Sequence, residues 1–122
     1  PPPLVIITTN EERELPAAFL RRCLVLQLSL PEADGELLDF LCKRGEVHFG
    51  ARCTDAVRRE AGELLLEDRK AAKARGLPAP GQAEYLDLLR AACNLATDEE
   101  GQKDWLGKIK QFVIKAPPAL PR

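Results

Sequence analysis

Long hydrophobic runs are missing from this sequence of 122 residues. No apolar stretch approaches the roughly 18–20 residues that a membrane-spanning helix requires. The chain also lacks the basic region and the long apolar region that together make a secretory signal. We therefore expect a protein without membrane association, located in the cytoplasm.

An excess of charge of one sign is also missing. Lys and Arg number 18 against 19 Asp and Glu, for a net charge of −1. A balance of this kind provides no general attraction to the phosphates of nucleic acid, and we expect no nucleic-acid partner. The chain is nevertheless 45% hydrophobic, which is enough for a real core. Its length suits one domain or a piece of something larger.

Closely spaced metal ligands are the third absence. The cysteines are Cys23, Cys42, Cys53 and Cys93, and no two form a Cys-x-x-Cys pair. A zinc site drawn from the last three with His48 is conceivable, but zinc sites usually bring two ligands together on one tight turn. We expect reduced cysteines in or near the core, a structural His48, and no metal site.

The first 31 residues suggest the end of a β-sheet. Residues 4–8, "LVIIT", are apolar or β-branched throughout, which is typical of a strand buried on both faces. A polar loop follows, then Pro16 in a position to open a short helical turn, and "CLVLQLSL" at 23–30 predicts a second strand. Two strands cannot form a doubly covered parallel sheet alone, so we expect residues 1–31 to be the end of a larger α/β core.

After residue 31 the sequence predicts helices, so the fold class is mainly α with a short β portion. Gly45 and Gly76 are the expected ends of the first two helices, and Thr54 and Thr97 are the expected N-caps of the second and the last. The predicted helices are 34–44, 54–75, 82–96 and 97–115, and the predicted core is Leu37, Leu38, Phe40, Leu41, Val57, Ala61, Leu64, Leu65, Tyr85, Leu86, Leu89, Ala92, Cys93, Ala96, Trp105, Ile109, Phe112 and Val113. A proline-rich segment at 116–122 predicts a linker or tail.

Two sets of polar residues are candidates for chemistry. Asn10 follows the first strand, and ligands of open α/β sheets lie at the carboxyl ends of strands. An asparagine there can orient a water molecule against a phosphate, or it can simply cap the loop. Arg21 and Arg22 point about 100° apart on a helical turn, so one can pair locally while the other projects. A projected arginine can stabilise a phosphoryl group in a neighbouring subunit, whereas the alternative is a solvated pair.

Taken together, the order strand, "TTN", acidic loop, "LPAAFLRR", strand, proline and helices resembles the C-terminal half of an AAA+ ATPase module. The nearest resemblance is to the MoxR-like group. It implies that 1–31 are C-terminal strands of the core, that 32–115 are the α-helical lid, and that "IITTN" is the sensor 1 strand. Asn10 is then the sensor, with Thr9 beside it at the nucleotide, and Arg22 is the arginine finger, with Arg21 as second choice.

The sequence also departs from the family. No Gly-x-x-x-x-Gly-Lys-[Ser/Thr] loop is present, nor a strand ending in paired acids. The resemblance implies ATP and Mg²⁺ as cofactors, so we expect both to be bound mainly by upstream residues of a longer protein. Where many lids carry a sensor 2 arginine, this chain has Gln82, and Arg90 lies farther along the helix, roughly 12 Å away at 1.5 Å per residue.

The function implied by the resemblance is that of a chaperone-like ATPase. Such a protein assembles as a homo-oligomeric ring, expected here to be hexameric, and couples ATP hydrolysis to the remodelling of a protein client. MoxR-like proteins are often partnered with von Willebrand factor A domain proteins. Two alternatives remain from the residues alone: a non-catalytic helical protein-interaction module, and a DNA-binding helical domain using Arg21, Arg22, Arg58 and Arg59.

Overall fold

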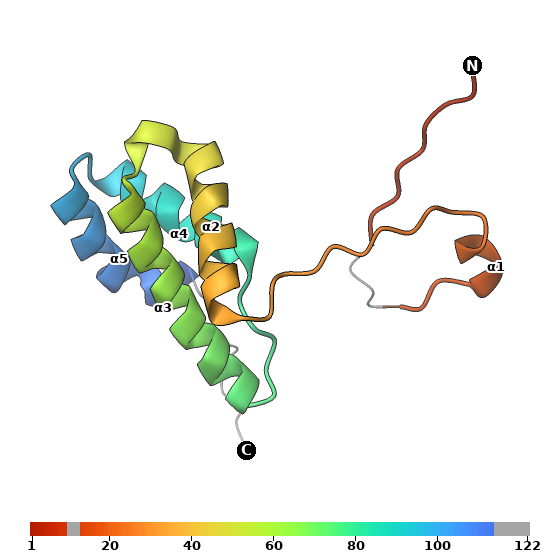
Figure 1. The fold of residues 1–122 in the computed structure, drawn as a ribbon. Coiled ribbons are helices and arrows are strands. Elements are labelled where there is room, and N and C mark those ends of the chain that lie inside the picture. Colours follow the sequence, from red (N-terminus) through yellow and green to blue (C-terminus); the bar gives the residue numbers. More distant parts are fainter. Residues whose placement is uncertain (10–12, 114–122) are drawn as a thin grey trace.

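A computed structural model describes residues 1–9 and 13–113, except for the side chains of residues 111 and 113. Its helices are α1 (Ala17–Leu20), α2 (Asp34–Phe49), the 3₁₀ turn η1 (Gly50–Arg52), α3 (Asp55–Ala74), α4 (Gln82–Leu95) and α5 (Glu99–Val113). Over these described residues the fold is all-α, with no β-strand. Helices α2 to α5 form a bundle, and the chain before residue 31 leaves it as a separate arm (Figure 1).

The strands predicted at 4–8 and 23–30 are therefore not formed. Both segments run as extended chain in the arm and carry α1 between them (Figure 1). Their apolar side chains are exposed, from Ile7 at 62% to Leu24 at 105%, except that Leu30 packs against the bundle core. A strand exists through hydrogen bonds to a neighbouring strand, and no described segment lies in register beside either stretch to supply them.

The bundle has a single hydrophobic core, to which each of the helices α2 to α5 contributes. Helix α4 packs on α5, α2 packs on α3, and α3 also contacts α4 and α5. Half of the predicted core residues are buried: Leu37, Leu41, Val57, Ala61, Leu65, Tyr85, Leu89, Ala92 and Cys93. A further set is partly buried and packs against this core: Leu38, Phe40, Leu64, Leu86 and Ile109. Leu88 and Leu106 are fully buried without having been predicted, and Phe112 was predicted wrongly, since it is 74% exposed.

Gly45 does not end α2, as the sequence had suggested. The helix continues to Phe49 and ends at Gly50, whose φ of 51° lies in the left-handed region that glycine adopts at little cost. Gly45 is instead a point of close approach. A Cβ built there would lie 2.9 Å from Leu89 Cδ1 and 2.9 Å from Tyr85 Oη, both on α4. Its lack of a side chain brings α2 close to α4.

Helix α3 begins and ends as predicted. The Thr54 hydroxyl accepts a hydrogen bond from the backbone N–H of Val57 at 3.4 Å, as an N-cap does. At the other end Gly76 has a φ of 67°, its N–H donates to Lys73 O, and the N–H of Leu77 donates to Ala72 O. These paired bonds are a Schellman motif, which satisfies the last carbonyls of the helix.

The start of α5 differs from the prediction by one residue. Asp98, rather than Thr97, accepts the backbone N–H of Gly101 at 3.0 Å. Aspartate is as good an N-cap as threonine. With Asp98 as the cap, Glu99 is the first residue of α5 and contacts the start of α3. The Glu99 carboxylate accepts a 2.7 Å hydrogen bond from the Thr54 hydroxyl, which ties the first turn of α5 to the N-cap of α3.

Gln102 is a buried polar residue that the sequence pattern did not single out. It is 2% exposed, and its side-chain amide donates to Arg52 O at 2.8 Å and to Ala96 O at 3.1 Å. Both carbonyls lie in connections between helices, where no helical N–H reaches them. One buried side chain thus joins two inter-helix connections, and the Cys93 thiol also donates to Arg52 O at 3.6 Å.

We predict that Gly45→Ala destabilises the protein by about 1–3 kcal/mol, the usual cost of overpacking a closed contact. The matched control is Gly107→Ala, since Gly107 lies within α5 with no neighbouring atom within 4 Å of an added Cβ. There the better helix propensity of alanine should stabilise the protein by up to about 1 kcal/mol. Urea denaturation measures both changes, and equal effects of the two variants would contradict the close approach at Gly45.

We also predict a titration shift at Glu99. Hydrogen bonds from Thr54 and then Lys103, with the charge of Lys103, hold the pKa of the Glu99 carboxyl below its ordinary value. A depressed folded pKa means that the contact stabilises the fold above the unfolded pKa and is lost as the pH falls through the folded pKa. An NMR titration of Glu99 should show the low pKa in the wild type and in Thr54→Ser, and a higher one in Thr54→Ala. An unchanged Glu99 pKa in Thr54→Ala would contradict the role of the Thr54 hydrogen bond in lowering it.

Candidate functional site

The two adjacent arginines follow a single helical turn that Pro16 opens, as predicted. Pro16 is the N-cap residue of α1, with φ −55° and ψ 135°, and its carbonyl accepts the N–H groups of Phe19 and Leu20 at 3.0 and 3.1 Å. A proline costs nothing here because its missing N–H would have no helical partner. The turn therefore presents Arg21 and Arg22 at its carboxyl end, on the exposed arm (Figure 1).

The environments of these two arginines differ. Arg22 Nη1 donates a 2.8 Å hydrogen bond back to the backbone carbonyl of Ala18. Arg21 is exposed, and no residue that the structure describes hydrogen-bonds to its side chain or forms an ion pair with it. The two adjacent arginines thus differ: the Arg22 guanidinium is bound to Ala18 O, and the Arg21 side chain is exposed without a partner among the described residues.

Of the other predicted site residues, Gln82 and Arg90 lie in the bundle, away from α1. Asn10 lies outside the described residues, as does the predicted linker at 116–122. Thr9 is exposed on the arm. Gln82 is the first residue of α4 in the bundle, and Arg90 lies two turns farther along that helix. Since α1 stands clear of the bundle, the structure brings the two arginines to neither Gln82 nor Arg90 (Figure 1).

A capping contact lies beside Gln82, and Arg90 has a partner on its own helix. The Glu84 carboxylate accepts the backbone N–H of Gly81 at 2.8 Å, which occupies one of the free donors at the start of α4 beside Gln82. Arg90 is exposed, and its Nη1 lies 2.5 Å from Asp87 Oδ1. The spacing of three residues between Asp87 and Arg90 on one helix is a visible signal for this pair, and the sequence reasoning missed it.

Two of the four arginines of the DNA-binding alternative, Arg58 and Arg59, are engaged within the bundle. Arg58 is 11% exposed, donates through Nη1 to the carbonyls of Gly50 and Cys53, and pairs with Asp55 at 3.8 Å. Arg59 pairs with Asp55 at 3.9 Å and with Asp39 at 4.0 Å. Guanidinium groups engaged in this way are not arranged to contact phosphates, which counts against that alternative.

The cysteines follow the expectation of core residues in three of four cases. Cys42, Cys53 and Cys93 are buried, whereas Cys23 is exposed on the arm. Burial raises the pKa of Cys42, and burial together with the neighbouring Cys93 thiol raises the pKa of Cys53. No group of histidine, cysteine or acidic residues in the described part of the chain could hold a metal ion.

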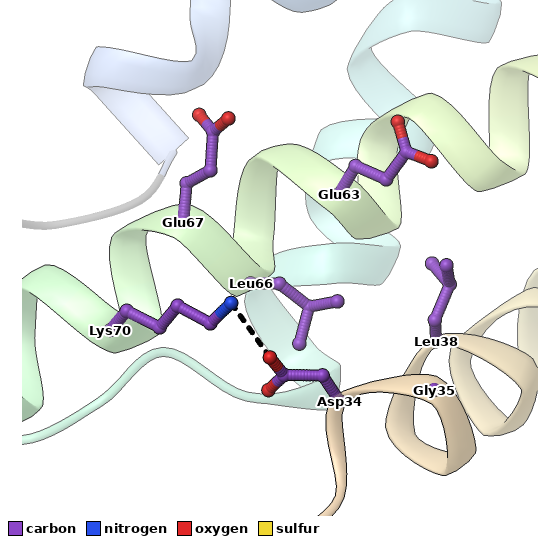
Figure 2. Close-up of a pocket in the computed structure, with 7 residues that line it drawn as sticks. All are labelled: Asp34, Gly35, Leu38, Glu63, Leu66, Glu67 and Lys70. Carbon is purple, nitrogen blue, oxygen red and sulfur yellow. Dashed lines mark ion pairs between the residues drawn. The ribbon is translucent and has the colours of Figure 1, made fainter.

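The bundle surface has an open groove between α2 and α3, next to the point where the arm joins. Leu38 and Leu66 form its apolar part, and Asp34, Glu63, Glu67 and Lys70 surround it with charge (Figure 2). Lys70 Nζ lies 2.7 Å from Asp34 Oδ2 across the groove. The groove includes none of the residues that the sequence marks as catalytic or nucleotide-binding.

No known family model, curated protein or solved structure matches this chain. The described helices are also all too short or too polar to cross a membrane.

We predict that one thiol reacts quickly with a disulfide reagent such as DTNB in the folded protein. Cys23 is exposed, and the other three thiols are buried, two of them with raised pKa values that disfavour the reactive thiolate. In denaturant the protein unfolds, and all four thiols should then react quickly. Cys23→Ser should abolish the fast phase, and a fast phase that survives this substitution would contradict the burial of the other three.

Proposed function

We propose that this chain is the C-terminal portion of an AAA+ ATPase module of the MoxR-like group. In this proposal the arm belongs to the core sheet, and the bundle from α2 to α5 is the helical lid. The parent protein binds ATP and Mg²⁺, assembles as a hexameric ring in the cytoplasm, and uses hydrolysis to remodel a client. A von Willebrand factor A domain protein is the partner we propose to test first.

The observation that carries the proposal is the apolar surface of the arm. Large apolar side chains on both sides of α1 are more than 60% exposed: Leu4, Val5, Ile6, Ile7, Leu24, Val25, Leu26 and Leu28. Burying such side chains contributes about 1.5–3 kcal/mol each, so a soluble protein has good reason to cover them. Two β-prone stretches joined by a helical turn fit neighbouring strands of a larger sheet better than they fit the helical bundle.

The chemistry assigned to the arm follows from this placement. In a parallel sheet Asn10 would stand at the carboxyl end of its strand, where nucleotides bind. Its amide would orient the attacking water, and an arginine of the α1 turn would reach the phosphoryl group held by the next subunit. Thr9 would contact the nucleotide beside Asn10, and the bundle would close over the nucleotide from the other side.

The described residues include no set of carboxylates for the magnesium ion. We therefore propose that the metal and the phosphate loop are held by other parts of the parent protein. A sensor 2 role for Arg90 is not part of the proposal, since Arg90 pairs with Asp87 on the exposed face of α4.

We predict that the 122-residue chain alone hydrolyses no ATP. In the parent protein, Asn10→Ala should lower kcat and leave nucleotide affinity nearly unchanged, because a water-positioning group acts mainly in the transition state. Steady-state kinetics with a separate binding measurement decide this. The matched control is Gln27→Ala, a polar residue of the second stretch without an assigned role. Losses of kcat and affinity by the same factor in Asn10→Ala would make Asn10 a binding or structural residue instead.

A non-catalytic interaction module is the second candidate, and one observation favours it. The bundle has its own core and its own capped helices, and it needs no contact from the arm beyond Leu30. A helical module of this kind can dock on a partner without any nucleotide. The two proposals separate on the parent protein: ATP turnover by the intact protein supports the first, and its absence with retained partner binding supports the second.

A further inference from the structure

The carboxyl end of α1 has one carbonyl that the backbone leaves unsatisfied. Ala17 O accepts the N–H of Arg21 at 3.1 Å, and Leu20 O accepts that of Cys23 at 3.1 Å. The N–H of Arg22 would reach Ala18 O if the helix continued, but it donates to Phe19 O at 3.0 Å instead. Ala18 O therefore receives no backbone N–H from the described residues, and it accepts the Arg22 side chain at 2.8 Å.

This contact makes Arg22 the cap of its own turn. A helix of four residues has hardly any bonds of its own, since the first and last turns overlap. A cationic side chain at the carboxyl end satisfies a carbonyl and also lies where the helix dipole favours positive charge. The Arg22 side chain folds back along α1 to do this, so its guanidinium points toward the preceding turn.

We propose that the two arginines divide one task, with Arg21 as the residue that enters the neighbouring nucleotide site and Arg22 as the positioning residue that holds the turn. The assignment rests on the proposed ATPase function. It reverses the order that alignment of "LPAAFLRR" gives, in which Arg22 is the finger. Arg21 leaves the turn about 100° away from Arg22, so the two heads do not share a direction.

The division predicts different tolerances to lysine. A finger needs the forked, planar guanidinium to span several phosphoryl oxygens, which a lysine ammonium cannot reproduce. A cap needs only one donor on a long flexible arm, and lysine supplies it. Arg21→Lys should therefore be nearly as damaging as Arg21→Ala, whereas Arg22→Lys should keep most of the turnover that Arg22→Ala loses.

The experiment measures ATP turnover and nucleotide affinity of the parent protein with these four variants. For Arg21→Ala and Arg21→Lys we expect kcat to fall on the order of 10³-fold or more at unchanged affinity, as for other arginine fingers. Because the finger acts in trans, Arg21→Ala subunits should regain activity when mixed with subunits disabled only at the phosphate loop. Arg22→Lys should resemble the wild type.

The outcomes separate this assignment from the function itself. A wild-type parent without ATPase activity overturns the proposed function, and the arginine assignment with it. An active parent in which Arg22→Lys is as inactive as Arg22→Ala, while Arg21→Ala keeps full turnover, leaves the function standing and overturns the assignment. Equal losses in Arg21→Lys and Arg22→Lys also overturn it, because the division of labour would not exist.

A second measurement tests the cap without any nucleotide. Backbone NMR chemical shifts report the helical state of residues 17–20 in the 122-residue chain. The helical shifts should diminish in Arg22→Ala and persist in both Arg22→Lys and Arg21→Ala. Shifts that change equally in Arg21→Ala and Arg22→Ala, or in neither, would overturn the capping role of Arg22.

Discussion

The close approach of three helices around Tyr85 is the constraint on which the bundle depends. Tyr85 is fully buried on α4, and its hydroxyl donates to Arg58 O on α3 at 3.1 Å. Gly45 on α2 leaves room for the Tyr85 hydroxyl, which lies 2.9 Å from an added Cβ. Gly62 on α3 leaves room for Leu38, whose Cδ1 an added Cβ would approach to 2.4 Å, and Tyr85 lies at a contact distance of 3.9 Å. The only tyrosine of the chain therefore joins three helices through one ring and one hydroxyl, and its burial also raises its pKa.

The sequence predicted local features well and contacts between distant segments poorly. Thr54, Gly76 and Pro16 act within a few residues of themselves, so their roles could be read from the chain. Gly45 was wrongly predicted to end a helix. A side chain at this position would collide with Tyr85 and Leu89, which lie about forty positions later in the sequence. Gln102 was overlooked for the same reason, since the carbonyl it satisfies belongs to Arg52. The candidate site shows the same limit: the order of its motifs is visible in sequence, whereas the direction of each arginine depends on α1.

The arm and the bundle differ in how far their apolar side chains are covered. In the bundle, apolar faces are covered by other helices of the same chain, and the polar groups inside have partners, apart from Arg58 Nε, for which no described residue supplies one. In the arm the apolar stretches remain open, and α1 is held by a few local hydrogen bonds. The bundle is stabilised by contacts among its own helices. The apolar stretches of the arm lack such contacts, so we expect another surface to cover and stabilise them. The proposed function resides in the arm, so its geometry depends on that covering surface.

The exposed "LVII" stretch has a practical consequence for anyone who produces this chain in isolation. A short β-branched segment without charge is the type of sequence that stacks into intermolecular sheets. Three prolines precede the stretch and the charged residues of "EERE" follow it, and both kinds of residue act as gatekeepers, but none of them lies within it. Concentrated samples are expected to self-associate through the arm, so a shortened chain beginning at Leu30, which packs against the core, is the better starting point for studies of the bundle alone.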